Sequence, residues 1–123
     1  MVKGVKKKVC CTDVLNLPEE MEVELKKLGG LDELKKRVPG REELAQEAEV
    51  FHAMSDPIRL QILHSLRDCA LCPCLLIEIT GLSNSKLSYH LSILEEARLI
   101  VSSPQKKWRI YMLTEEGRSR VNG

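Results

Sequence analysis

The sequence predicts one mainly helical domain that carries a single β-hairpin, an α+β fold, and three observations support this prediction. The chain has 123 residues, the size of one ordinary domain. Apolar residues recur at helical spacing along most of the chain, and glycine or proline separates the segments. Two β-prone segments, residues 99–101 and 108–113, flank a polar stretch with one proline, which is typical of a hairpin.

The first forty residues predict a basic arm followed by short helices. Residues 18–28 carry one apolar face and end at a glycine pair, and residues 31–38 add a further short helix. The apolar face consists of Met21, Leu25 and Leu28. Because Pro39 and Gly40 break the helical pattern, we expect residues 1–40 to form an arm with extra helices that contribute to a dimer and to ligand binding.

Two more helices are predicted between residues 41 and 68. The first begins near Arg41 and has one apolar face, made of Leu44, Ala48 and Phe51. The second begins at Pro57, with Asp56 as its N-cap. Its apolar stripe is Ile58, Ile62 and Leu66.

The centre of the chain predicts two helices joined by a short turn. Residues 74–80 are apolar and fit a strand or a helix, but Gly81 and a candidate N-cap, Ser83, favour a helix-turn-helix. The second helix runs to about Ala97, with an apolar stripe made of Leu87, Leu91 and Leu94. With the hairpin and a short helix after Thr114, this order predicts a winged helix-turn-helix over residues 41–116 and a short tail at 117–123.

Composition excludes several function classes. The net charge of the chain is +1, but residues 83–123 hold seven basic and four acidic residues. This local basic excess favours binding to the phosphate backbone of a nucleic acid. Aromatic residues make up only 3%, which argues against base stacking on single strands. The longest apolar run, residues 69–77, is too short for a membrane span, and the start carries no secretory pattern, so we expect a cytoplasmic protein.

The polar face of the second central helix is the predicted DNA-reading surface. Short amides and hydroxyls near the start of such a helix suit base edges in the major groove. The candidates are Asn84, Ser85, Lys86, Ser88 and Tyr89. On the hairpin, Lys106, Lys107 and Arg109 are expected to contact phosphates and to fix the register.

Four motifs in order resemble the ArsR/SmtB family of metal-responsive repressors, in its branch with a Cys-x-Cys inducer site. They are residues 54–63 (MSDPIRLQIL), 72–74 (CPC), 78–83 (EITGLS) and 87–91 (LSYHL). The resemblance covers about residues 42–116. It implies a homodimer that binds an operator in double-stranded DNA, represses the genes behind it and is released by a metal or metalloid ion. It also places Asn84, Ser85, Ser88 and Tyr89 against bases.

The resemblance makes Cys72 and Cys74 the candidate inducer site. Thiolates select thiophilic ions such as As(III), Cd(II) or Pb(II), with Zn(II) also suitable. Residues i and i+2 of a regular helix point apart, so one ion at both sulfurs requires an irregular or distorted helix start. Candidates for the third and fourth ligands are Cys69 and the adjacent pair Cys10 and Cys11. Leu75 and Ile77 stand where family members carry an aspartate and a third cysteine, which leaves the ion open.

Two other functions on the same fold remain open from the sequence. Two of the five thiols can form a disulfide that alters DNA binding, which would make the protein a redox switch. Alternatively, a permanent zinc ion stabilises the module without sensing. An enzyme is not expected, because no catalytic constellation is visible and the three histidines have no catalytic context. Among these, His90 is expected to be structural.

Overall fold

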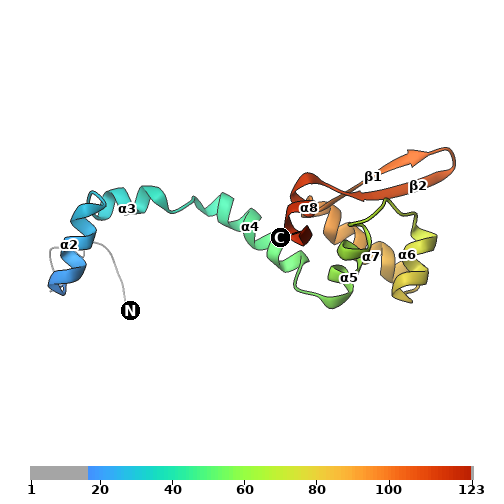
Figure 1. Cartoon of the computed structure of the whole chain (residues 1–123), viewed down its shortest axis with the longest axis horizontal. Coiled ribbons are helices and arrows are strands. Elements are labelled where there is room, and N and C mark those ends of the chain that lie inside the picture. The colour runs from blue at the N-terminus through green and yellow to red at the C-terminus, as the bar shows by residue number, and fades with distance from the viewer. Residues whose placement is uncertain (1–16, 123) are drawn as a thin grey trace. The chain divides into compact units, whose positions relative to one another are not determined.

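The computed structural model describes residues 17–122, and its contacts divide the chain into two compact units with the boundary between Gly40 and Arg41 (Figure 1). The described part of the first unit holds α2 (Glu19–Lys27) and α3 (Leu31–Arg37). Cys10 and Cys11, two of the candidate ligands, lie outside the described residues. None of the described helices is long and apolar enough to cross a membrane.

The glycine pair ends α2 as the sequence predicts. The N–H of Gly29 donates to the carbonyl of Lys26 (3.0 Å) and the N–H of Gly30 donates to that of Leu25 (2.9 Å), which satisfies two end carbonyls of the helix. Both glycines have positive φ, 101° and 94°. An ordinary residue adopts this conformation only at a cost, and the pair therefore fixes the turn between α2 and α3.

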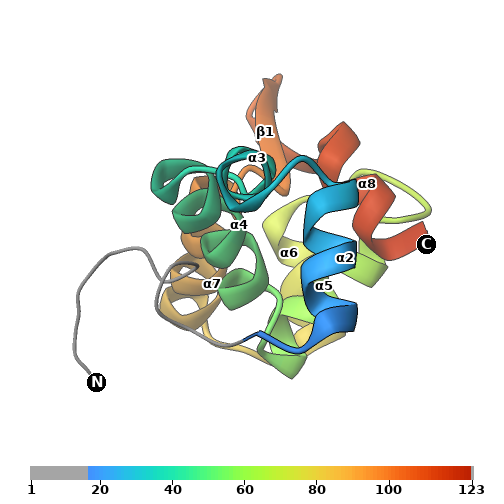
Figure 2. The ribbon, with the colours of Figure 1, turned by 90° about the vertical axis from the view of Figure 1, so that its left-hand side faces the viewer.

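The second unit confirms the predicted order of elements and the winged helix-turn-helix fold. Its elements are α4 (Arg41–Ala53), α5 (Pro57–Ser65), α6 (Pro73–Thr80), α7 (Asn84–Glu96), β1 (Ile100–Gln105), β2 (Trp108–Leu113) and α8 (Glu115–Asn122). The apolar segment before Gly81 is helical, as the turn chemistry indicated. The two strands form one antiparallel sheet that projects from the helices of this unit (Figures 1 and 2).

The hairpin loop is shorter than the sequence predicted. Residues 102–105, expected as loop, continue β1, and the strands pair from Ile100 with Leu113 to Gln105 with Trp108. The turn is therefore reduced to Lys106 and Lys107. Lys106 has a φ of 58°, and two-residue hairpin turns need such left-handed backbone. The wing is consequently longer and carries its basic residues at its far end.

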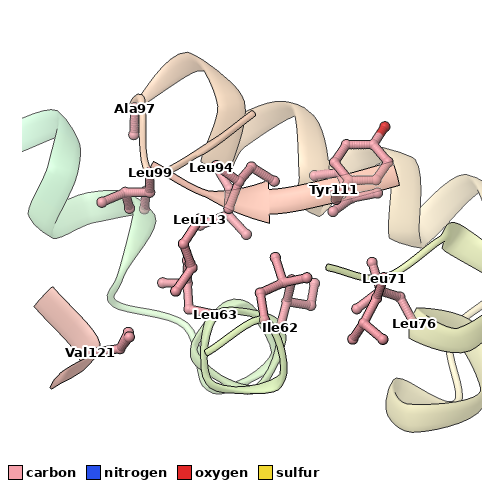
Figure 3. Packing of buried hydrophobic residues seen from close by; sticks show 14 of the residues in the cluster. Ile62, Leu63, Leu71, Leu76, Leu94, Ala97, Leu99, Tyr111, Leu113 and Val121 are labelled. Atoms are coloured by element: carbon pink, nitrogen blue, oxygen red, sulfur yellow. The ribbon is translucent and has the colours of Figure 1, made fainter. Parts of the chain in front are cut away.

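One apolar core unites α5, α7 and the hairpin. Side chains such as Leu63, Leu94 and Leu113 converge there, and the first two are fully buried (Figure 3). From α4 the core takes Val50 and Ala53, whereas the face that the sequence singled out is exposed: Leu44, Ala48 and Phe51. Periodicity thus found a real apolar face, but that face does not pack into the core.

Residues 117–122, expected as a tail, continue α8, which packs on the domain. Thr114 caps this helix: its Oγ1 accepts from the N–H of Gly117 (3.0 Å) and donates to the carbonyl of Arg98 (2.7 Å). Gly117 is buried against the carbonyl of Leu99, which leaves no room for a Cβ. Val121 adds a buried side chain to the core.

Asp56 caps α5 as predicted. Its Oδ1 accepts from the N–H of Ile58 (2.8 Å) and of Arg59 (3.2 Å). Burial acts to raise the pKa of Asp56, but these two backbone hydrogen bonds, with the charge of Arg59, outweigh it. The pKa of this carboxyl therefore lies below its ordinary value of 3.8.

We expect the Asp56→Ala substitution to destabilise the protein by about 0.5–2 kcal/mol at pH 7, because two N–H groups at the helix start lose their acceptor. A lowered pKa stabilises the fold above the unfolded-state value, and this contribution disappears as the pH falls through the folded-state value. The difference from wild type should therefore shrink below about pH 4 in urea denaturation. Asp56→Asn, which keeps an acceptor, is the control. A difference that stays constant down to pH 2 would contradict this assignment.

Candidate DNA-binding surface and thiol cluster

The turn between α6 and α7 sets the direction of the candidate recognition helix. Gly81 has a φ of 74°, and its N–H donates to the carbonyl of Ile77 (2.7 Å). Ser83 then caps α7, with its Oγ accepting from the N–H of Lys86 (3.3 Å). Because a left-handed residue and a cap follow within three positions, the end of α6 directly determines where α7 begins.

The polar face of α7 lies in solvent, as a DNA-reading face must. All five predicted side chains are exposed, namely Asn84, Ser85, Lys86, Ser88 and Tyr89. Behind them the helix buries Leu87, Leu91 and Leu94, together with His90. The two faces of α7 are therefore segregated, with the polar side chains in solvent and the apolar stripe in the core.

Arg59 holds α7 to the rest of the domain, a role that the sequence did not single out. Its buried guanidinium donates from Nη1 to Nδ1 of His90 (3.1 Å) and from Nε to the carbonyl of Ala53 (2.8 Å). A third contact reaches the carbonyl of His52 (3.4 Å). Since a guanidinium has no acceptor, Nδ1 of His90 is unprotonated and its ring proton is on Nε2. His90 is structural, as expected, and His52 and His64 are exposed.

The ring of His90 also supports Tyr89 on the reading face. The two rings meet edge to face with their centroids 5.2 Å apart, while Tyr89 remains 61% exposed. The buried ring of His90 therefore contacts both the guanidinium of Arg59 and the exposed ring of Tyr89.

The wing presents a compact basic tip. Lys106, Lys107 and Arg109 are all exposed, as predicted. Between them Trp108 is also exposed at 47%, and sequence reasoning missed it. Its place in the sequence between Lys107 and Arg109, within the basic segment, is the signal that would have found it.

The three described cysteines are free thiols around the start of α6. Cys72 is the N-cap of α6 with extended backbone (φ −86°, ψ 163°), Pro73 is the first helical residue and Cys74 lies in the first turn. Cys69 and Cys74 are exposed, and Cys72 is half-buried. Because Cys72 is not helical, the pair escapes the opposed geometry of i and i+2 residues within a regular helix. No three His, Cys, Asp or Glu side chains among residues 17–122 are grouped to hold a metal ion.

A short backbone bridge ties the thiol segment to the wing. The N–H of Leu71 donates to the carbonyl of Tyr111 (3.0 Å), and the N–H of Tyr111 donates to that of Leu71 (2.8 Å). Both residues are buried. The cysteine segment is therefore anchored to β2 on one side of Cys72 and continuous with α6 on the other.

Comparison with known proteins agrees with this fold. Residues 56–102 match the family model "Bacterial regulatory protein, arsR family". The arsenical resistance operon repressor of Bacillus subtilis is 40% identical over 81 residues, which cover 65% of this chain and 74% of that protein.

Among solved structures, HlyU from Vibrio cholerae has a TM-score of 0.62 at 28% identity and covers 68% of this chain and 91% of that one. A homodimeric winged helix-turn-helix DNA-binding domain from Mycobacterium bovis has a TM-score of 0.61 at 24% identity, over 69% and 81% of the chains, and shows the fold.

The fold and the segregated faces of α7 define a DNA-binding transcriptional regulator of the winged helix-turn-helix class. More specifically, the chain belongs to the ArsR family of bacterial regulatory proteins. This is a non-enzymatic family, in agreement with the absence of a catalytic constellation in the sequence.

We expect Arg59→Met to lower both stability and DNA affinity, because it leaves Nδ1 of His90 and a buried carbonyl without a donor. The cost should be about 1–3 kcal/mol in urea denaturation. Affinity for DNA, measured by fluorescence anisotropy, should fall in parallel as α7 loses its anchor. Arg67→Met, at an exposed arginine after α5, is the matched control. An Arg59 variant with wild-type stability would refute the anchoring role.

Proposed function

We propose that this protein is a transcriptional repressor whose release from its operator is caused by a thiophilic metal or metalloid ion at Cys72 and Cys74. The observation that carries the proposal is the position of the two thiols at the irregular start of α6, whose other end sets the start of α7. The similar Bacillus subtilis protein, an arsenical resistance operon repressor, supports both the repression and the class of ion.

In this proposal the exposed face of α7 contacts the DNA bases, and the wing contacts the phosphate backbone of the DNA. Asn84, Ser85, Ser88 and Tyr89 offer amide and hydroxyl groups of the length that base edges accept in the major groove. Lys86 is suited to a phosphate. Lys106, Lys107 and Arg109 at the far end of the hairpin give an electrostatic contact that carries no sequence information.

The thiols at the start of α6 suit a thiophilic ion, but residues 17–122 do not bring together a complete set of ligands for one. Cys72 and Cys74 supply two soft sulfurs, and Cys69 lies exposed three residues upstream. We assign the remaining ligands to Cys69 or to Cys10 and Cys11. When bound, the ion would supply bonds to sulfur that draw the N-cap and the first turn of α6 together.

Movement of Cys72 has two routes to the DNA-binding surface. The first runs along α6 to Gly81 and the cap of α7. The second runs through the Leu71–Tyr111 bridge into the wing strand β2. An ion that binds one arrangement of these segments more tightly than the other would shift the DNA-binding equilibrium toward that arrangement.

We further propose a homodimer that uses the exposed face of α4 together with α8. Phe51 is 54% exposed, and the guanidinium of Arg120 in α8 lies 5.1 Å from its ring centroid. Leu44 extends the same face along α4. An aromatic residue beside an arginine is typical of the centre of protein interfaces.

A thiol–disulfide switch is the second candidate function, since Cys69, Cys72 and Cys74 are all reduced and accessible at least in part. A purely structural zinc ion is less well supported. The core of the second unit contains no cysteine, so such an ion would stabilise the segment around the start of α6 rather than the core itself.

We expect neutralisation of the wing to weaken DNA binding equally for all sequences. Lys107→Ala and Arg109→Ala should each reduce the slope of log K against log salt by about 1, as one phosphate contact is lost. Ser88→Ala should instead reduce the preference for the operator over unrelated DNA. Anisotropy titrations at several salt concentrations separate these effects, with Arg67→Ala as the control. Unchanged salt slopes in both wing variants would place the phosphate contacts elsewhere.

We expect As(III), Cd(II) or Pb(II) to weaken operator binding of the reduced, metal-free protein about 5- to 150-fold. Cys72→Ser and Cys74→Ser should bind DNA like wild type and fail to respond. Cys69→Ser tests whether the third described thiol is a ligand. If wild type ignores every ion but loses DNA on reversible oxidation, the redox switch replaces the ion sensor. Unfolding on chelation would instead support the structural zinc ion.

A further inference from the structure

We propose that α2 packs against α3 of a second copy of this chain, and that two such contacts form an N-terminal part of the dimer. This inference rests on the homodimer proposed above and extends it to residues 19–38. Both helices lie in the first unit, whose described part contains no buried residue.

None of residues 17–40 is fully buried, and this requires an explanation. α2 has nine residues and α3 has seven, and isolated helices of that length are marginal in water. The ion pairs within them, Glu24 with Lys27 at 3.6 Å and Glu33 with Lys36 at 3.8 Å, are exposed and therefore stabilise them little. Helices of this kind gain most of their stability by burying an apolar face.

Each helix, with its C-cap residue, has one apolar stripe ready for such burial. In α2 it consists of Met21, Leu25 and Leu28, and in α3 of Leu31, Leu34 and Val38. Leu25, Leu28 and Leu31 are half-buried, whereas Met21 is 52% exposed and Val38 is 56% exposed, so a large part of both stripes remains uncovered within one chain.

The charges beside the stripes identify the partner. At 100° per residue, Glu22 and Glu24 border the α2 stripe on its two sides, and Lys35 and Arg37 border the α3 stripe. An α2–α2 pair would oppose acid to acid, and an α3–α3 pair would oppose base to base. Only α2 against α3 is complementary, as with the flanking charges of coiled coils.

A two-fold axis makes this contact occur twice. If α2 of one subunit meets α3 of its partner, symmetry places α3 of the first against α2 of the second. The contact is therefore closed, which favours a dimer over an open chain.

Two charge-reversal variants of the full chain test the proposal by sedimentation velocity. The variant Glu22→Lys/Glu24→Lys changes α2, so that basic residues border the stripes of both α2 and α3. The variant Lys35→Glu/Arg37→Glu changes α3, so that acidic residues border both stripes. Each variant alone should weaken the dimer at least about tenfold, since four attractive contacts become repulsive. An equimolar mixture of the two should dimerise like wild type, which also shows that both variants are folded.

Lys26→Glu/Lys36→Glu is the matched control. It makes the same change in charge as the acidic variant, but at positions away from both stripes, and should leave dimerisation unchanged. Phe51→Glu separates this inference from the proposed homodimer, because it disrupts only the α4–α8 face.

The outcomes are distinct. Loss of the dimer in Phe51→Glu with wild-type behaviour in both charge variants would reject the α2–α3 contact and retain the homodimer. A mixture that stays as weak as its components would also reject the contact. A monomeric wild type would reject both proposals.

Discussion

The guanidinium of Arg59 is the interaction on which the arrangement of this domain depends. Arg59 lies in the first turn of α5 and joins this helix to the last carbonyls of α4 and to the buried histidine of α7, which is 31 residues away in the sequence. The rest of the packing of α7 consists mainly of the apolar contacts of Leu87, Leu91 and Leu94, which restrict rotation about the helix axis less strictly than directed hydrogen bonds do. A planar donor with several fixed directions supplies the missing constraint on rotation. The orientation of the five exposed polar side chains of α7 therefore depends on this buried polar contact.

Much of the fold was predictable because it rests on local chemistry. Short local patterns predicted the helix ends correctly. These patterns are Asp56 before Pro57, Gly81 before Ser83 and the leucine stripe of α7. The hairpin turn was not predictable, since a lysine at a left-handed position resembles any loop residue in the sequence. The apolar stripe of α4 was visible, but periodicity does not say what a stripe packs against.

The candidate site was predictable to a similar extent. Motif spacing located the polar residues of α7, the basic wing and the cysteines before and at the start of α6. The structure exposes the polar residues of α7, the basic residues of the wing, Cys69 and Cys74, and half-buries Cys72. Arg59 and His90 are 31 residues apart in the sequence, and Leu71 and Tyr111 are 40 residues apart. No local sequence pattern predicts contacts over such separations. These long-range contacts are nevertheless the ones that connect the thiol segment and the anchor helix to the DNA-binding surface.

The position of Trp108 has a practical consequence. It is the only tryptophan in the sequence, and it lies exposed beside the turn of the wing. The indole emission of this protein therefore originates from one place, the far end of the hairpin, and from no residue of the core. An unlabelled sample carries its own optical reporter for the wing, while the bulk of the domain remains spectroscopically silent at the wavelengths that select indole.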